Sequence, residues 1–257
     1  MTADWEQLGG WRVVRRTVAA STMDEVRTLL AQEAAPWAVV AGRQDAGRGR
    51  FGRAWQCPTG MGLLVSVATA VSDAEMPRAG LLSGAAGLAA LAAIREATGA
   101  VASLKWPNDV VVGGRKLAGI LVEVARDSIG ATWAVTGIGI NVNQHPEDLD
   151  PQIRDTAASL RMVTGRTWQP EELLGPLLLT LSETTQLWRT DQDALVHQWS
   201  THEVTQGRQV WVTRGEDRQP AISLGVTATG ALRVRWPSGD TEDLGSGEVS
   251  LRLRGGS

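Results

Sequence analysis

Three arginines alternate with three glycines in the segment GRGRFGR, which runs from Gly47 to Arg53. Glycine lets a backbone approach a ligand closely, and a guanidinium group can bind carboxylate or phosphate through two parallel hydrogen bonds. Arg48, Arg50 and Arg53 therefore suit an anionic ligand. A solvated, flexible surface loop would have the same composition, so the arginines alone do not decide between the two interpretations.

A second polar group lies in KWPNDV, which begins at Lys105 and contains Pro107. Proline fixes the backbone there, and the amide of Asn108 beside the carboxylate of Asp109 could hold Mg²⁺ or a ribose. An Asx turn that begins a hairpin would explain the same two residues without a ligand. The segment predicts either a nucleotide contact or a turn.

Lys116 follows a Gly-Gly pair and precedes Ala118 and Gly119, whose small size leaves room for a ligand beside its ammonium group. A solvated strand residue is the alternative interpretation. Farther along the chain, GIGINVN ends in Asn141 and Asn143, which could bond a ligand or only terminate a strand. Polar groups at the ends of three separated elements predict one convergent site.

Apolar runs and turn residues predict that these groups are positioned by a mixed α/β sheet. Strands are expected over residues 37–42, 62–69, 110–112, 117–124 and 132–140, with a Gly-Gly turn between the third and fourth. Helices are expected over residues 22–34, 83–98, 170–188 and 191–199. Ser21 and Asp24 have the spacing of a capping box, and Gly99 stands at the position of a helix C-cap.

The pattern changes from Gly207 onward. Short alternating runs are separated there by Gly, Asp and Ser, with no helical stretch. They predict a small β-barrel or β-sandwich. The chain is therefore expected to divide near residue 205 into a larger α/β domain, residues 1–205, and a small β domain, residues 206–257.

Composition narrows the class of protein. A chain of 257 residues can bury a sizeable core, and its single cysteine, Cys57, excludes an intrachain disulfide and favours a reducing, cytoplasmic compartment. Cys57 is expected to be a packed small side chain rather than a catalytic thiol. The net charge of −3 gives no general attraction for nucleic acid. Export and membrane anchoring are not expected, since the apolar runs fall far short of a bilayer span.

The motifs GRGRFGRAW, KWPNDV, RKLAGILVE and GIGINVN, with GEVSLR near the C-terminus, resemble those of biotin protein ligases in order and spacing. The resemblance covers nearly the whole chain. It implies a catalytic domain related to class II aminoacyl-tRNA synthetases, followed by an SH3-like β-barrel. It also implies that biotin and MgATP form biotinyl-5′-adenylate and pyrophosphate, after which a lysine of a biotin carboxyl-carrier protein takes the biotin and releases AMP.

The resemblance also assigns roles by position. The implied biotin contacts are Ser21, Thr22, Gln44, Gly47, Arg48, Gly49, Arg50, Lys116 and Gly119. The implied ATP contacts are Arg48, Arg50, Arg53, Trp55, Lys105, Asn108, Asp109, Lys116 and Asn141. The catalytic candidates are Arg48, Arg50, Asp109 and Lys116. The cations among them would lower the barrier as charge builds on phosphorus. Side chains are not expected to fix Mg²⁺, which arrives with ATP, and Asp109 is its candidate ligand.

Met23 departs from the family pattern, in which Asn follows the Ser-Thr pair. A backbone contact to the ligand would survive this change, whereas a side-chain contact would not. For Ser21, a role as helix N-cap stands beside ligand contact. The Gly-Arg loop is expected to close over the reactive intermediate and keep water away, so that replacing Arg50 with Gly would release biotinyl-adenylate.

Two alternatives remain open. A lipoate or octanoate ligase shares the fold and the acyl-adenylate chemistry, although the GRGR and KWPND segments favour biotin. A DNA-binding regulator belongs to a different class, and it is not expected because twenty residues before Ser21 are too few for a winged helix-turn-helix and the chain is acidic. Both a monomer and a homodimer are compatible with the sequence.

Overall fold

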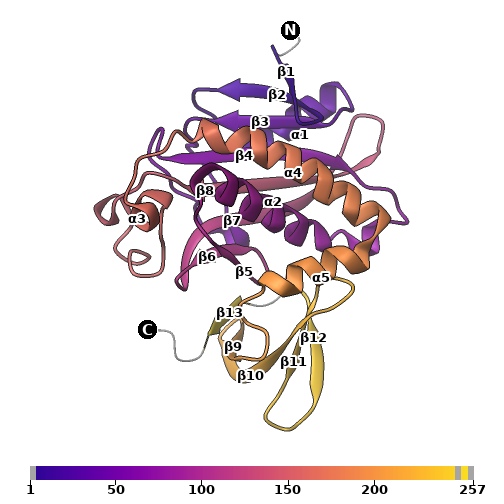
Figure 1. The fold of residues 1–257 in the computed structure, drawn as a ribbon. Coiled ribbons are helices and arrows are strands. Elements are labelled where there is room, and N and C mark those ends of the chain that lie inside the picture. Colours follow the sequence, from indigo (N-terminus) through magenta and orange to yellow (C-terminus); the bar gives the residue numbers. More distant parts are fainter. Residues whose placement is uncertain (1–3, 247–249, 254–257) are drawn as a thin grey trace.

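The computed structural model describes residues 4–246 and 250–253. Its largest element is an eight-stranded sheet with the order β1-β2-β3-β4-β8-β7-β6-β5 (Figure 1). The strands are β1 (Glu6–Leu8), β2 (Trp11–Arg16), β3 (Trp37–Ala41), β4 (Gly62–Ala70), β5 (Ser103–Lys105), β6 (Asp109–Val112), β7 (Arg115–Arg126) and β8 (Thr132–Asn141). β2 and β3 pair in parallel, and the other neighbouring strands of this sheet are antiparallel.

Helices cover both faces of this sheet. They are α1 (Thr22–Gln32), α2 (Leu81–Thr98), α3 (Leu160–Thr164), α4 (Glu171–Thr190) and α5 (Gln192–His202), with the short 3-10 helices η1 (Arg50–Gly52), η2 (Met76–Arg78) and η3 (Pro146–Asp148). α2 and α4 pack on one face and form the larger core, while α1 packs on the other face over a smaller core (Figure 1). Strand alternation separates the two cores, since Ile138 of β8 enters the larger core and Val135 the smaller one.

The predicted strands and helices of this part are present, with ends shifted by a few residues. Gly113 and Gly114 both have positive φ, 56° and 79°, as a two-residue hairpin turn of this kind requires. Gly99 is left-handed and donates to the Arg95 carbonyl oxygen, which confirms the predicted C-cap. The predicted capping box is wrong, because Ser21 occupies the N-cap position of α1 but its side chain makes no capping hydrogen bond.

The C-terminal part is a second, antiparallel sheet, seen below α5 in Figure 1. Its strands are β9 (Gln209–Arg214), β10 (Asp217–Val226), β11 (Leu232–Arg235), β12 (Thr241–Leu244) and β13 (Ser250–Leu253), in the order β12-β11-β10-β9-β13. The prediction of an all-β C-terminal part is thus confirmed over the described positions. β12 and β13 are the two edges of this sheet, so closure into a barrel is not shown. Gly247 to Val249 of the GEVSLR motif lie outside the described residues.

α2 is apolar enough, and at 18 residues long enough, to cross a membrane by length and composition, which differs from the expectation of much shorter apolar runs. In the structure 67% of this helix is buried. It packs against the sheet, α4 and α5, as a core helix does. The contact with α5 is close: a Cβ built on Gly84 would lie 2.0 Å from the ring of Trp199.

Candidate active site

A floor of glycines lies on the α1 face of the sheet, where β7 and β8 run side by side. Gly119 of β7 pairs with Gly139 of β8, and Gly137 lies two residues earlier on the same face. Met23 of α1 covers Gly137, where a Cβ would lie 3.0 Å from the Met23 sulfur. The indole of Trp55 covers the other two glycines, at 2.5 Å from a Cβ built on Gly139. Larger residues would displace this ring.

The Gly-Arg loop is folded as a small hairpin beside this floor. The Gly49 N–H donates to the Arg53 carbonyl oxygen at 2.7 Å, and the Trp55 N–H donates to that of Gly47 at 2.9 Å. A Cβ on Gly47 would lie 2.5 Å from the Trp55 carbonyl oxygen, so this crossing requires glycine. Phe51 stands at the loop tip, exposed and left-handed with φ 58°. The loop therefore has a defined fold that places Trp55 on the sheet.

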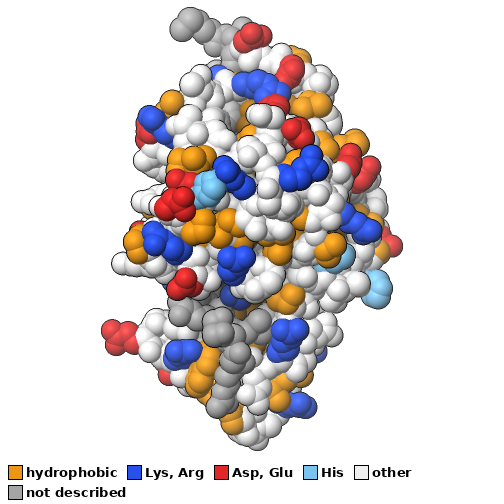
Figure 2. Space-filling view, turned by 60° about the vertical axis from the view of Figure 1, so that its left-hand side comes forward, with side chains coloured by type: hydrophobic (Ala, Val, Ile, Leu, Met, Phe, Trp, Pro, Cys, Tyr) orange, Lys and Arg blue, Asp and Glu red, His pale blue; other side chains and the backbone are white. Residues whose placement is uncertain are grey.

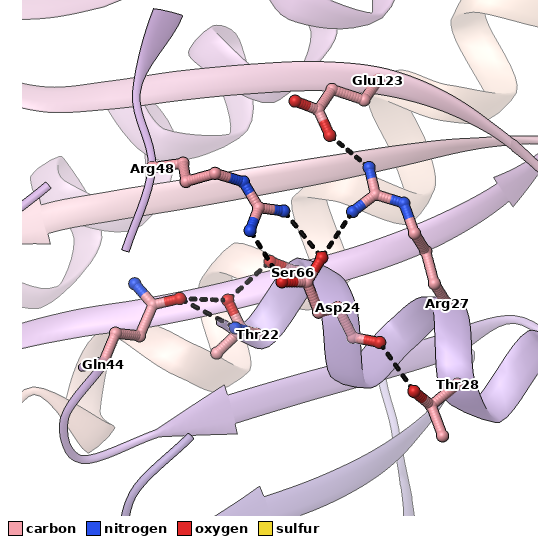
Figure 3. A network of polar contacts seen from close by, with 8 residues as sticks. All are labelled: Thr22, Asp24, Arg27, Thr28, Gln44, Arg48, Ser66 and Glu123. Atoms are coloured by element: carbon pink, nitrogen blue, oxygen red, sulfur yellow. Dashed lines mark hydrogen bonds and ion pairs between the residues drawn. The ribbon is translucent and has the colours of Figure 1, made fainter. Parts of the chain in front are cut away.

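A buried hydrogen-bond network lies at the Gly137 end of the floor. The backbone N–H and the hydroxyl of Thr22 both contact Gln44 Oε1, at 2.8 and 3.0 Å, and the hydroxyls of Thr22 and Ser66 are 2.7 Å apart (Figure 3). Ser66 pairs with Gly137 across β4 and β8. These contacts hold Gln44 through its oxygen. Its amide nitrogen has no partner among the described residues and can donate to a ligand. Ser21 is buried at the start of the same helix.

An ammonium, a carboxylate and an indole meet at the other end of the floor, around Gly119. The Lys116 Nζ atom lies 2.5 Å from Oδ1 of Asp109, 3.1 Å from a Cβ built on Gly119 and 5.5 Å from the ring centre of Trp55. The backbone of Lys116 is fixed by hydrogen bonds to the loop before α3, at Thr156 and Ala158. The sequence contains one other lysine, Lys105, and it lines a small cavity together with Asp109.

Arg50 joins this cationic end from the loop. It donates to Oδ1 of Asn108 at 3.3 Å and to the Ser246 carbonyl oxygen. Burial lowers the pKa of Arg50, and the charge of Asp109 opposes that shift. Asn108 in turn donates to the Ile120 carbonyl oxygen of β7 at 2.7 Å, a contact between the turn before β6 and a strand twelve residues farther along the chain, which a local Asx turn would not make. The structure therefore brings together Arg50, Asn108, Asp109 and Lys116, as the sequence predicted.

Other candidate residues point elsewhere. Both terminal nitrogens of Arg48 donate to Asp24 of α1, so this guanidinium is engaged outside the floor. Asn141 donates to the Ala158 carbonyl oxygen and accepts from Gln144, which favours the interpretation that it only terminates a strand. Asn143 exchanges two hydrogen bonds with the backbone of Trp168. Arg53 is exposed at the end of the loop hairpin.

One buried donor in the site lacks an acceptor. Trp55 Nε1 is buried without a hydrogen-bond partner in the part of the chain that the structure describes. A buried N–H left unpaired costs free energy, so this donor would gain from an acceptor that a ligand brings. Sequence reasoning missed Ser66, although a serine within the apolar run GLLVSVAT was a usable signal. It also missed Asp24 as a partner of the loop.

The KWPND segment is tied to the C-terminal part of the chain. Glu203 accepts a hydrogen bond from the Trp106 N–H at 2.8 Å, and its other oxygen accepts from the N–H and hydroxyl of Thr205. Burial raises the pKa of Glu203, against the opposing effect of these hydrogen bonds. The Trp106 indole donates to the Gly230 carbonyl oxygen at 3.0 Å. The residues that follow Trp106 in the site therefore depend on contacts beyond residue 200.

The described residues contain neither a reactive thiol nor a preformed metal cluster. Cys57 is buried, and this burial raises its pKa to about 12, so the thiol stays protonated as expected of a packed side chain. Within the described ranges, no group of three His, Cys, Asp or Glu side chains could hold a metal ion.

Comparisons with known proteins place these features in context. A model of the biotin/lipoate A/B protein ligase family matches residues 13–143. The biotin–[acetyl-CoA-carboxylase] ligase of Mycobacterium tuberculosis is 35% identical over 211 residues, covering 79% of this chain and 75% of that protein. The bifunctional ligase/repressor BirA of Bacillus subtilis is 38% identical over 127 residues, which are 49% of this chain and 39% of that longer protein. A solved structure of biotin protein ligase from Aquifex aeolicus in complex with biotin and ATP has a TM-score of 0.80 and 30% identity, covering 94% of this chain and 99% of that one.

Proposed function

Since the chain belongs to the biotin/lipoate A/B protein ligase family, we propose that it is an ATP-dependent biotin protein ligase. It first joins biotin to ATP, giving biotinyl-5′-adenylate and pyrophosphate. It then transfers the biotinyl group to a lysine of a biotin carboxyl-carrier protein and releases AMP. A relative of similar sequence is named a biotin–[acetyl-CoA-carboxylase] ligase, and a carrier domain of such a carboxylase is the proposed acceptor.

The glycine floor is the observation that carries this proposal. It has a neutral hydrogen-bond network beside Gly137 and a cationic group beside Gly119. Gly119 and its partner Gly139 lie about 7 Å from Gly137 along the strand direction. An acid with a polar ring at one end and a carboxylate at the other matches this arrangement. Biotin has that shape, with its ureido ring suited to Thr22 and Gln44.

We assign roles to the residues accordingly. Ser21, Thr22 and Gln44 bind the ring, while Gly47, Gly49 and Gly119 let the loop, Trp55 and Lys116 pack closely around the ligand. Lys116 and Arg50 bind the carboxylate and the α-phosphate. As the carboxylate oxygen attacks phosphorus and pyrophosphate leaves, negative charge grows on the phosphoryl oxygens, and fixed cations lower that barrier electrostatically. Trp55 Nε1 donates to an oxygen of the intermediate.

The nucleotide lies against the remaining predicted residues in this proposal. Lys105, Asn108 and Asp109 line it, with Arg53 at the loop exit and Asn141 behind the floor as a structural support. Mg²⁺ arrives with ATP and neutralises phosphate charge, and Asp109 is the side chain that would meet it. The donor set fits a metal held mainly by phosphate oxygens and water, because carboxylates are scarce there.

The C-terminal part contributes to the same site. We propose that it is a separate SH3-like unit that begins near residue 206 and helps to close the ATP site. The contacts of Arg50 with Ser246 and of Trp106 with Gly230 support this role. Acidic and basic side chains are interspersed over the face seen in Figure 2, in keeping with the prediction that DNA is not a partner. Cytoplasmic location stays a prediction of the sequence, with which both a monomer and a homodimer are compatible.

Incubation of the protein with biotin, ATP, Mg²⁺ and a carrier domain tests the proposal. We expect one biotinylated lysine on the carrier by mass spectrometry, and none on a carrier whose acceptor lysine is replaced by arginine. A parallel reaction with lipoate identifies the alternative ligase. Absence of biotin transfer by the wild-type protein, alongside a working reference ligase, would refute the assignment.

A further inference from the structure

Four charged side chains form a chain of ion pairs between α1, β7 and the Gly-Arg loop (Figure 3). Arg48 donates from both terminal nitrogens to the two carboxylate oxygens of Asp24, at 2.6 and 2.7 Å. Arg27 donates to Asp24 at 2.8 Å and also to Glu123 of β7. Charges of opposite sign therefore alternate from β7 through α1 to the loop. In these contacts the Asp24 carboxylate pairs with two arginines, Arg27 and Arg48.

Asp24 is free for this contact because it is not used as a cap. Its place in the motif STMD suggested a capping box with Ser21, but the Ser21 side chain makes no capping hydrogen bond. The Asp24 carboxylate faces the loop instead. The hydrogen bond from Arg48 is the largest cause of the lowered pKa of Asp24, and Arg48 has a raised pKa for the reciprocal reason. The pair is thus charged on both sides over the neutral range.

Arg48 is placed where a tether would control the loop. The isolated bridge between Arg48 and Ala54 joins the two legs of the loop hairpin, directly before the residue that covers the floor, Trp55. A second arginine of the loop, Arg50, points away from α1 toward Asn108 and Ser246. One arginine therefore fastens the base of the loop, and the other presents its charge at the site.

We propose that Asp24 is a positioning residue that anchors the Gly-Arg loop through Arg48, so that Trp55 stays on the glycine floor and Arg50 faces the phosphate. The orientation of Arg50 toward the phosphate rests on the proposed function, whereas the anchoring of the loop does not. Because the Asp24 and Arg48 side chains remain 47% and 35% exposed, the effect of breaking the pair is partial.

Trypsin provides a test on the free protein, since it cleaves after arginine. We expect Asp24→Asn and Arg48→Gln each to accelerate cleavage after Arg50 and Arg53 by about three- to tenfold, within the range of a bidentate surface ion pair. The double variant should cleave no faster than Arg48→Gln alone, because the two residues act through one contact. Glu6→Gln is the control, since Glu6 forms an ion pair with Arg15 at the β1 edge of the larger sheet, away from β7 and β8. Its loop cleavage should equal that of the wild type.

Release of labelled biotinyl-adenylate provides the second measurement. Asp24→Asn should release the intermediate about three- to tenfold faster than the wild type, with a smaller change in its rate of formation at saturating ligands. If the wild type forms no adenylate, the proposed function fails, while the trypsin result still decides the anchoring. Wild-type cleavage rates in Asp24→Asn, or additive effects in the double variant, would overturn the proposal. Arg48→Gln breaks the same contact from the loop side, so it decides the case should Asp24→Asn fail to fold.

Discussion

The Lys116 ammonium is held in place before any ligand arrives. Asp109 lies 2.5 Å from Nζ, the Trp55 ring lies over it, and two backbone hydrogen bonds fix the residue. A charge held in this way needs little rearrangement to meet a growing negative charge, which is why fixed cations lower barriers more than mobile ones do. The ion pair also fixes the direction of the ammonium group, so we expect Lys116 to act as a charge and not as a nucleophile.

Replacing Lys116 with Gln tests this role. We expect adenylate formation to slow by about a hundred- to a thousandfold, because a charge that stabilises the transition state is lost. Pyrophosphate release in a single turnover measures the rate. Arg115→Gln removes a neighbouring charge at the hairpin turn and should leave the rate unchanged. Equal rates for Lys116→Gln and the wild type would exclude Lys116 from the chemistry.

At the scale of residues, the sequence predicted the cationic end of the site better than the rest. Asn108, Asp109 and Lys116 lie close together because one hairpin carries them, so their proximity followed from local spacing. The direction of the Arg48 side chain could not be predicted from local spacing. It depends on Asp24, which is near in space only after α1 has packed on the sheet.

At the scale of elements, glycine decides which surfaces can approach. On β8, small residues let the Trp55 indole reach the sheet, and on α2, Gly84 lets the α5 tryptophan Trp199 approach the helix. The second contact fixes α5, which leads the chain from the larger sheet into the C-terminal part. An alternating pattern identifies such elements but does not say which of their glycines are in contact.

Two helical glycines give a matched test of this packing. Gly84→Ala should destabilise the protein by about 1–3 kcal/mol, because the new Cβ would lie 2.0 Å from the Trp199 ring and overpacking outweighs the gain in helix propensity. Gly175→Ala in α4 should stabilise it by about 0.5–1 kcal/mol, since a Cβ there meets no atom within 4 Å. Urea unfolding of both variants measures the difference. Similar shifts in the two variants would contradict the close contact.

Periodicity predicted the long elements, whereas short or charged ones escaped it. β2 reads WRVVRR, and its three arginines conceal a strand whose Trp11, Val13 and Val14 are buried. β5 has three residues and is defined mainly by its partner β6. The order of strands was not predictable either, because it depends on pairings between segments far apart in sequence.

At the scale of the whole molecule, a buried carboxylate joins the two parts. Glu203 accepts hydrogen bonds from Trp106 on one side and Thr205 on the other. The Trp106 side chain reaches Gly230, in the connection between β10 and β11 of the C-terminal sheet. Hydrogen bonds therefore link the end of α5, the KWPND segment and the C-terminal part across the division predicted near residue 205.

The pH dependence of Glu203→Gln checks this junction. Burial raises the pKa of Glu203 above its usual 4.5, so the folded state binds the proton more tightly than the unfolded chain does. The contribution of Glu203 to stability therefore falls as pH rises from about 4.5 through the folded pKa, and it is constant above that. Glutamine does not titrate, so the stability of the wild type relative to Glu203→Gln should decrease over this window. Urea unfolding at several pH values measures it, and a difference that rises with pH would contradict the assignment.

Both lysines of this chain lie at the proposed site, and every other cationic side chain apart from the histidines is an arginine. An acyl-adenylate reacts with free amines, whereas a guanidinium stays protonated and is a poor nucleophile. Lys116 is held by its ion pair with Asp109 inside the site. If the proposed function holds, the outer surface of the protein offers almost nothing that an escaping acyl group could modify. The molecule would be chemically inert toward its own product, which leaves the acceptor lysine of the carrier as the favoured target.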